Sequence, residues 1–214
     1  MPARRAVLFV NGVIPDYARA RDLLEDGDYC IAVDGGARHA LALGHAPHVL
    51  IGDLDSVPAA IRDSLAQSGT RILQFPVEKN QTDLELALEF AVKEDFFRIL
   101  FLGGLGGRTD QTVANLSLLL RADLDARDVR IDDGREEAFL IRRERGLRGE
   151  PGDTVSLLPF GADARGVTTD GLHFPLHEET LCASQTRGVS NRMTGTDAVV
   201  RVNEGVLLCI HTRS

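Results

Sequence analysis

Five aspartates follow four short apolar runs, at positions where strands of a parallel sheet would end. They are Asp34, Asp53, Asp55, Asp83 and Asp110. Carboxylates gathered in one place repel one another unless a cation neutralises them. Mg²⁺ in proteins prefers a few carboxylate oxygens together with water and phosphate oxygens. The pattern therefore predicts a magnesium site that also holds phosphate groups.

Glycines and two basic residues accompany these acids. Gly35 follows Asp34 directly, and the segment 103–107 contains four glycines. Backbone N–H groups beside glycine can approach phosphate oxygens closely, and helix N-termini add favourable dipoles. Lys79 and Arg108 supply the positive charge that a polyphosphate requires. Together these residues predict metal-assisted phosphoryl chemistry on a nucleotide.

Two well-known phosphate-binding patterns are absent. The pattern G-x-x-x-x-G-K-[ST] would require Gly at position 102 and Lys at position 108, where the chain has Leu102 and Arg108. The glycine-rich segment also lacks the G-x-G-x-x-G spacing of dinucleotide folds. The sequence therefore predicts a nucleotide site of another kind.

The acids are positioned by alternating strand and helix patterns in the first 125 or so residues. Predicted strands are 6–10, 29–33, 48–51, 71–75 and 98–102, and predicted helices are 17–24, 37–43, 59–67, 83–92 and 110–120. This alternation is typical of an open parallel α/β sheet, in which the loops at the carboxyl ends of the strands form the ligand crevice. The sequence Thr82-Asp83-Leu84-Glu85 is a capping box, which predicts a helix that begins at Asp83.

After residue 128 the pattern changes to strand-like runs broken by Gly, Pro and Asp. These runs are 130–132, 138–141, 154–158, 166–168, 198–202 and 206–210. We therefore predict an α/β protein with two domains. Residues 1–127 form an open parallel α/β domain that binds nucleotide and Mg²⁺, and residues 128–214 form a smaller all-β, sandwich-like domain.

Composition narrows the partners and the compartment. The chain has 24 Lys and Arg against 32 Asp and Glu, a net charge of −8, so we expect neither nucleic acid nor anionic membrane as a partner. No apolar run approaches the roughly 18 residues of a membrane helix. The three cysteines, Cys30, Cys182 and Cys209, are far apart and lack a C-x-x-C spacing. A reducing cytoplasm is the simplest setting for them.

Over nearly the whole chain, the residues resemble the thiamine pyrophosphokinase family. The segments that carry the resemblance are Val33-Asp34-Gly35-Gly36-Ala37, Ile51-Gly52-Asp53-Leu54-Asp55-Ser56, Phe75-Pro76 with Thr82-Asp83, Gly106-Gly107-Arg108-Thr109-Asp110-Gln111, Ser156-Leu157-Leu158-Pro159-Phe160, Thr169-Asp170-Gly171-Leu172 and Gly188-Val189-Ser190-Asn191. Their order and spacing together are specific, whereas no single segment would be.

The resemblance implies that ATP and Mg²⁺ convert thiamine to thiamine diphosphate and AMP, in a homodimer with active sites at the subunit interface. Thiamine then binds to the β domain. Carried over by position, the catalytic residues are Asp53, Asp55, Asp83 and Asp110, and the first three are the Mg²⁺ ligands. Implied ATP contacts are Asp34, Gly35, Lys79, Thr82, Arg108 and Gln111, and implied thiamine contacts are Phe174, Ser190 and Asn191.

Three features depart from the family pattern, and one of them is Cys182-Ala183 in place of the usual Phe-Gly pair. Asn80 stands where the family often carries another Asp, so an amide replaces one implied metal or phosphate contact. Phe174 stands near the position where the family usually places Trp or Tyr beside thiamine, so the ring is kept without a polar group.

Two other functions are consistent with parts of the sequence. Asp53-Leu54-Asp55 after a strand is similar to the D-x-D pattern of haloacid-dehalogenase-like phosphatases, in which Asp53 would be the nucleophile. That mechanism also needs a downstream acidic pair, such as Asp132-Asp133. The second alternative is a non-catalytic sensor that binds nucleotide or thiamine.

Overall fold

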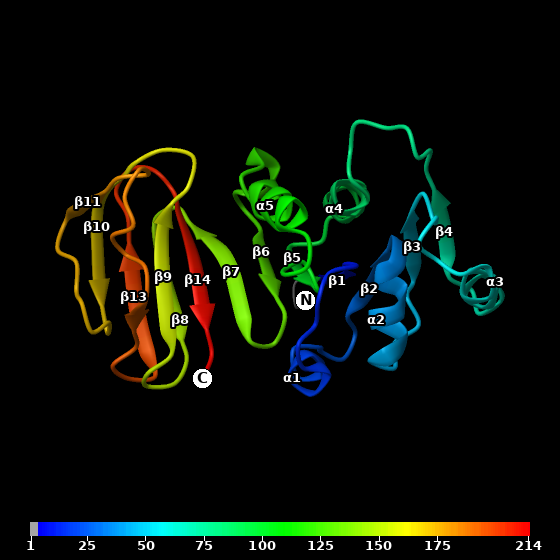
Figure 1. Cartoon of the computed structure of the whole chain (residues 1–214), viewed down its shortest axis with the longest axis horizontal. Coiled ribbons are helices and arrows are strands. Elements are labelled where there is room, and N and C mark those ends of the chain that lie inside the picture. The colour runs from blue at the N-terminus through cyan, green and yellow to red at the C-terminus, as the bar shows by residue number, and fades with distance from the viewer. Residues whose placement is uncertain (1–3) are drawn as a thin grey trace. The chain divides into compact units, whose positions relative to one another are not determined.

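The computed structural model describes residues 4–214, which divide into two compact units: unit 1 ends at Gly134, and unit 2 is Arg135–Ser214. Figure 1 colours the chain from blue in unit 1 to red at the end of unit 2. The elements of unit 1 are β1 (Arg5–Phe9), α1 (Tyr17–Asp22), β2 (Tyr29–Val33), η1 (Asp34–Gly36), α2 (Ala37–Ala42), β3 (Val49–Gly52), α3 (Ala59–Gln67), β4 (Arg71–Gln74), α4 (Asp83–Lys93), β5 (Arg98–Leu102), α5 (Thr109–Leu118), η2 (Ala122–Leu124) and β6 (Asp128–Asp132).

Unit 1 contains six parallel strands in the order β6-β5-β1-β2-β3-β4. The strand order reverses beside β1, because β2 pairs with one of its edges and β5 with the other. In open α/β sheets, a ligand crevice forms at such a reversal, outside the carboxyl ends of the strands. The predicted open parallel sheet is thus confirmed.

The central strands of unit 1, β1, β2, β3 and β5, are apolar over most of their length because helices pack against them. Every residue of β1 is buried, and Val7 and Phe9 belong to a cluster with Ala20 of α1 and Ala40 of α2. On the same face, Leu50 of β3 packs with residues of α3. Strands buried on both sides lose the alternating pattern of a half-exposed sheet.

Helix α4 begins where the capping box predicts. The Thr82 hydroxyl accepts a hydrogen bond from the Glu85 N–H at 3.2 Å, which satisfies one of the free donors of the first turn. The buried residues of α4 include Leu84, Leu88 and Ala91, on the side that packs against β1, β2 and β3. Its first residue, Asp83, is therefore held at the carboxyl end of the sheet.

Unit 2 is a sandwich of two antiparallel sheets. Its strands are β7 (Glu136–Ile141), β8 (Glu144–Arg148), β9 (Thr154–Pro159), β10 (Ala164–Asp170), β11 (Glu179–Leu181), β12 (Asn191–Arg192), β13 (Asp197–Arg201) and β14 (Leu207–Thr212). Within the unit, the orders are β12-β9-β14-β7 and β11-β10-β13-β8. Side chains from both sheets, including Phe139, Val155, Val167 and Val200, form one core cluster. The predicted all-β second domain is confirmed.

The division between the units differs from the predicted one, which ended the first domain at residue 127. Strand β6 pairs in parallel with β5, from Arg98 opposite Asp128 to Leu102 opposite Asp132, and so belongs to unit 1. Residues 130–132 were predicted among the strand-like runs of the second domain, because no helix separates this strand from β7. Strands β8, β11 and β12 were not predicted either, since their short runs carry charged or polar residues.

No helix among residues 4–214 is long and apolar enough to cross a membrane.

A buried charged cluster ties the strands of unit 2 together. His211 on β14 is 1% exposed, and its two ring nitrogens lie 3.0 Å from Glu137 Oε1 and 2.9 Å from Asp153 Oδ2. Because an ionised carboxylate only accepts, both nitrogens donate when Glu137 and Asp153 are ionised, and the imidazole then carries a positive charge. The hydrogen bond to Glu137 raises the pKa of His211 against the opposing effect of burial. Burial opposes the charge of Asp153, yet hydrogen bonds from the N–H groups of Glu150 and Ser214 lower its pKa to about 2.

We predict that His211 stabilises the protein most at low pH. A histidine whose folded pKa is raised contributes stability that is complete below its unfolded pKa, near 6.5, and is lost as the pH rises through the folded pKa. His211→Gln should lower the free energy of unfolding by about 3 kcal/mol near pH 6, because the buried carboxylates lose their charged partner. The difference from wild type should shrink as the pH rises. Urea unfolding followed by circular dichroism measures it.

His177→Gln is the matched control, because His177 is exposed in the same unit. It should leave the pH dependence of unfolding as in the wild type. A constant difference between wild type and His211→Gln across the pH range would show that folding does not change the pKa of His211.

Candidate active site

A cavity of about 550 Å³ opens at the carboxyl ends of the strands of unit 1. The loops that follow β1 and β5 meet there, since the Gly12 N–H donates to the Gly103 carbonyl at 2.9 Å. A Cβ at Gly12 would lie 2.3 Å from that carbonyl oxygen, so only glycine fits. The predicted residues that line the cavity are Asp34, Lys79, Thr82, Asp83, Arg108 and Gln111.

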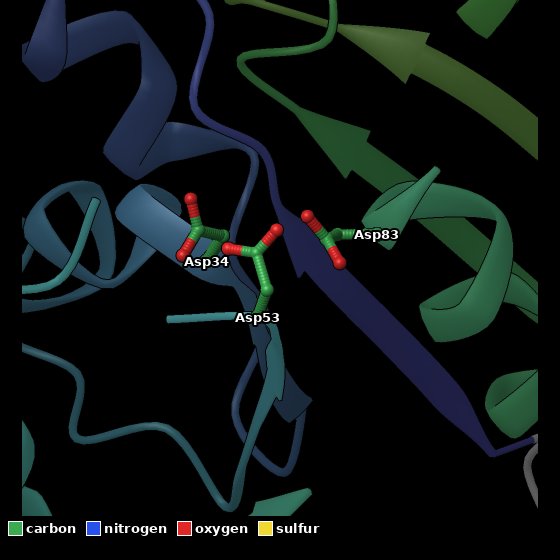
Figure 2. A group of neighbouring side chains, drawn as sticks. All are labelled: Asp34, Asp53 and Asp83. Atoms are coloured by element: carbon green, nitrogen blue, oxygen red, sulfur yellow. The ribbon is translucent and has the colours of Figure 1, made fainter. Parts of the chain in front are cut away.

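Three of the five aspartates form one cluster. Asp34, Asp53 and Asp83 each offer a carboxylate oxygen, and the three oxygens lie within 4.8 Å of one another. Figure 2 shows the carboxylates of Asp34 and Asp53 side by side, with that of Asp83 facing them from the start of α4. Segments from three separate parts of the chain thus bring their acids to one point.

Unusual backbone angles set the side-chain directions of Asp34 and Asp53. Asp34 has φ 46° and Leu54, just after Asp53, has φ 67°, a left-handed conformation that side chains other than glycine adopt rarely. Gly36 lets η1 approach β1, because a Cβ there would lie 1.9 Å from the Phe9 carbonyl oxygen. Strained conformations of this kind persist where the surrounding structure enforces them, and they gather at functional sites.

Lys79 is the cation nearest to two of the carboxylates in the described part of the chain. Its Nζ lies 3.0 Å from Asp83 Oδ1 and 3.5 Å from Asp53 Oδ2. The N–H of Asp55 and the ammonium of Lys79 lower the pKa of Asp53. Burial raises the pKa of Asp83, and the charges of Asp53 and Asp34 act in the same direction. Burial opposes the charge of Lys79, but Asp83 and Asp53 outweigh it and raise its pKa.

The donor set fits a hard divalent cation. Asp34 is 8% exposed, and its Oδ1 atom is buried without a hydrogen-bond donor among the described residues. Asp83 Oδ1 is also buried, and the Lys79 ammonium pairs with it at 3.0 Å. Buried carboxylate oxygens normally have partners, so Asp34 Oδ1 fits a metal ligand as it stands, and Asp83 Oδ1 fits one once the ammonium moves away.

Two predicted acids lie outside this cluster. Asp55 is exposed, and its Oδ1 accepts a hydrogen bond from the Ser56 hydroxyl at 3.0 Å. Asp110 is also exposed and pairs with Arg108 through two hydrogen bonds, one from Nε at 3.1 Å. This pairing lowers the pKa of Asp110. The structure therefore gathers Asp34, and not Asp55, with Asp53 and Asp83.

Several lining residues were not predicted from the sequence, among them Asn11, Arg38, Gln81 and Asn115. Asn115 is buried, and its Nδ2 donates to the Gly104 carbonyl at 2.8 Å, which holds the glycine-rich loop to α5. Asn11 covers Gly35, where a Cβ would lie 2.6 Å from Asn11 Nδ2. The Asn11-Gly12 pair, directly after the first predicted strand, is the sequence feature that could have indicated Asn11 as a lining residue.

His39 fixes one wall of the cavity. Its Nε2 lies 3.1 Å from the Gly12 carbonyl oxygen, and its Nδ1 lies 2.6 Å from the Tyr17 hydroxyl. Because the carbonyl only accepts, Nε2 carries the proton and Nδ1 accepts from Tyr17 in the neutral ring. Burial lowers the pKa of His39, which favours the neutral form. This chain of contacts links α1 and α2 to the loop after β1.

Unit 2 carries a second cavity of about 540 Å³. Phe174 and Ser190 line it, together with Gly152, His173, Arg192, Met193 and Thr194. The Asn191 side chain is engaged by the backbone, because its Oδ1 accepts from the Phe174 N–H at 3.0 Å and its Nδ2 donates to the Phe174 carbonyl at 2.8 Å. Asn191 therefore positions Phe174, which is 64% exposed.

The acidic pair required by the phosphatase alternative lies in unit 1 rather than in the β domain. Asp132 ends β6 and is fully buried, and its Oδ1 accepts from the Gly134 N–H at 2.9 Å. It is not among the carboxylates that cluster with Asp53 in the described structure.

Sequence comparisons identify both halves of the chain. Residues 20–131 match a family model described as "Thiamin pyrophosphokinase, catalytic domain", and residues 140–207 match "Thiamin pyrophosphokinase, vitamin B1 binding domain". A thiamine pyrophosphokinase from Bacillus subtilis is 26% identical over 209 residues, which is 94% of each chain. Thiamine pyrophosphokinase 1 of Oryza sativa subsp. japonica is 24% identical over 88% of this chain and 80% of its own.

Solved structures share the fold. The crystal structure of thiamine pyrophosphokinase from Bacillus subtilis has a TM-score of 0.89 at 24% identity and covers 99% of this chain and 100% of its own. Yeast thiamin pyrophosphokinase has a TM-score of 0.79 at 18% identity, over 99% of this chain and 87% of its own.

We predict that Asp34→Asn stabilises the protein without metal and abolishes its response to Mg²⁺. Removing one of three clustered charges relieves repulsion worth about 1 kcal/mol. Wild type should gain thermal stability when Mg²⁺ is added, since a ligand that binds the folded state raises its Tm. Thermal unfolding with and without Mg²⁺ measures both effects.

Asp26→Asn removes the same charge from an exposed position outside the cavity and serves as the control. It should keep the wild-type gain in Tm with Mg²⁺. If Mg²⁺ raised the Tm of Asp34→Asn as much as that of the wild type, the cluster would not be the metal site.

Proposed function

The chain belongs to the thiamine pyrophosphokinase family, and from this premise we infer that it transfers the pyrophosphoryl group of ATP to the hydroxyethyl group of thiamine. The products are thiamine diphosphate and AMP. The observation that carries this proposal is the cluster of Asp34, Asp53 and Asp83 at the strand ends of unit 1, beside a cavity that Asp34, Asp83, Lys79 and Arg108 line. The second cavity, in the unit that matches the vitamin B1 binding model, is the proposed thiamine site.

We propose that Asp34, Asp53 and Asp83 hold Mg²⁺. When bound, Mg²⁺ neutralises charge on the polyphosphate. Lys79 and Arg108 line the same cavity and add two positive charges for the phosphate oxygens. Gly106 and Gly107 line the same cavity, and we propose that N–H groups of their loop contact those oxygens as well.

The reaction requires the thiamine hydroxyl oxygen to attack the β-phosphorus in line while AMP leaves. Positioning and charge neutralisation contribute most of the catalysis in such transfers. The hydroxyl proton needs an acceptor, for which Asp83 and Asp110 are the candidates. Without metal, burial raises the pKa of Asp83, whereas the Arg108 guanidinium lowers the pKa of Asp110. Mg²⁺ bound to Asp83 would oppose the first shift, so both carboxylates stay candidates for the proton acceptor.

Phe174 is proposed to cover the thiamine ring. It lines the cavity of unit 2 with an exposed ring, and the His173 ring meets it edge-on at a centroid distance of 4.5 Å. Ser190, with φ 60°, lies on the same cavity, and its N–H is held by the Ser156 hydroxyl at 3.0 Å. An aromatic face beside a cationic thiazolium is favourable.

We further propose a homodimer with active sites at the subunit interface, acting in the cytoplasm. The dimer follows from the family resemblance, and light scattering of the purified protein tests it. The cytoplasmic setting is supported by the cysteines, because Cys30, Cys182 and Cys209 are all free.

The comparisons and the site do not support the two alternatives. Every family model and curated relative above is a thiamine pyrophosphokinase, and Asp53 clusters with Asp34 and Asp83 rather than with Asp132. Binding of nucleotide or thiamine without catalysis would not require three mutually repelling carboxylates beside the cavity proposed to hold phosphate.

We predict that the protein, incubated with ATP, Mg²⁺ and thiamine, forms AMP in step with thiamine diphosphate. Asp53→Asn should lower kcat/KM at least ~100-fold, because it removes a proposed Mg²⁺ ligand and with it the charge neutralisation at the reacting phosphates. Chromatography of the nucleotides and thiamine esters measures both products.

Asp63→Asn is the control for this variant, because Asp63 is exposed on α3. Its turnover should equal that of the wild type. ADP as the nucleotide product, or near-normal turnover in a folded Asp53→Asn protein, would contradict the proposal.

Phe174→Ala should raise KM for thiamine by about tenfold, with a smaller effect on kcat, because an aromatic contact is worth about 1 kcal/mol beyond its buried area. Initial rates at varied thiamine concentration measure the two constants. Phe97→Ala, which removes an exposed ring from unit 1, should change neither. An unchanged KM in Phe174→Ala would place thiamine elsewhere.

A further inference from the structure

Lys79 occupies the position where a bound cation would meet the carboxylates. Its Nζ lies 3.0 Å from Asp83 Oδ1, 3.5 Å from Asp53 Oδ2 and 3.0 Å from the Pro76 carbonyl oxygen. The Lys79 side chain is 14% exposed, so these acceptors replace most of its contact with water. Two of the three acceptors belong to the cluster that fits Mg²⁺.

The ammonium and a metal ion therefore compete for the same charges. The three carboxylates carry three formal negative charges, and Lys79 offsets one of them. The Lys79 ammonium pairs with Asp83 Oδ1 at 3.0 Å, and no backbone donor holds that oxygen in the described structure, so a metal ion can take the place of the ammonium. Two unit charges about 4 Å apart interact by about 1 kcal/mol even in water, and a divalent ion beside a lysine feels twice that repulsion.

Phosphate oxygens bound in the same cavity would give the Lys79 ammonium a second set of acceptors. Lys79 lies on segment 75–82, the long connection between β4 and α4 in Figure 1, which has no regular secondary structure. It lines the phosphate cavity together with Arg108. The flexible four-carbon stem of a lysine lets its ammonium move between neighbouring acceptors without a backbone change. The Asp34 carboxylate, in contrast to the Lys79 ammonium, is held in one place because it is buried at the start of η1.

We propose that Lys79 is an exchangeable counter-ion: its ammonium neutralises Asp53 and Asp83 while the site lacks metal, and it moves to phosphate oxygens when a metal nucleotide enters. Metal alone then binds weakly, because it must displace an ammonium that has no new partner. Metal bound to a polyphosphate binds well, because the same ammonium gains phosphate oxygens. The inference rests on the proposed function only for the class of nucleotide.

The test measures binding of metal alone and of metal with nucleotide, without thiamine and without turnover. Lys79→Met should tighten binding of Mn²⁺ alone, followed by electron paramagnetic resonance of free Mn²⁺, by about tenfold. The same substitution should weaken binding of Mg²⁺ with α,β-methylene-ATP, measured by calorimetry, by about tenfold, since a charge-assisted phosphate contact is lost. Opposite changes in the two affinities are the expected result.

Three further proteins sharpen the test. Lys79→Arg keeps the charge and should bind Mn²⁺ alone as weakly as the wild type. Lys93→Met removes the other lysine of the chain, which is exposed at the end of α4, and should leave both affinities unchanged. Wild-type protein labelled with ¹³C-lysine should show two lysine signals, of which that of Lys79 alone shifts when Mg²⁺ and the analogue are added.

Lys79→Met that binds Mn²⁺ alone no more tightly than the wild type would overturn the proposal. Unchanged affinity for the metal and analogue would overturn it too, since the ammonium would then have no phosphate partner. Failure of AMP formation in the thiamine assay would instead overturn the proposed function, and it produces neither of these results.

Discussion

The closeness of three carboxylates, from Asp34, Asp53 and Asp83, is the constraint on which the rest of unit 1 depends. Like charges separated by less than 5 Å repel strongly in a partly buried site. Only a rigid framework can hold them there. The parallel strands β2 and β3 and the capped start of α4 supply that framework, and the buried apolar core beneath them provides the stabilising free energy.

The two units handle buried charge in different ways. In unit 2, His211 sits between Glu137 and Asp153 with both ring nitrogens engaged, so the charges are paired and the cluster is structural. In unit 1, the carboxylates outnumber the one lysine that contacts them, and Asp34 Oδ1 has no donor in the described structure. A fully paired network fixes strands in place, whereas an incompletely paired one attracts a ligand.

Much of the fold could be predicted because local patterns agreed with the tertiary structure. Strands β2 and β5 and helix α3 occupy the predicted residues, since parallel strands buried on both faces are continuously apolar and their helices are long enough to show a period. Strand β6 was assigned to the wrong side of the division between the units, because its place in the parallel sheet comes from pairing with β5, far away in the sequence. Strands β11 and β12 are too short to show any pattern.

The sequence by itself determined that acids follow the strands, that glycines accompany them, and that α4 begins at Asp83, because residue type and local hydrogen bonding decide these features. Only the tertiary structure decided which acids meet. Asp55 is two residues from Asp53 yet points to solvent, whereas Asp34 arrives from another strand and completes the cluster. The role of Asn191, whose amide holds the Phe174 backbone, is likewise visible only in the fold. Side-chain direction at the end of a strand depends on a few backbone angles, such as the positive φ of Asp34 and Leu54, and these are set by packing against neighbouring strands.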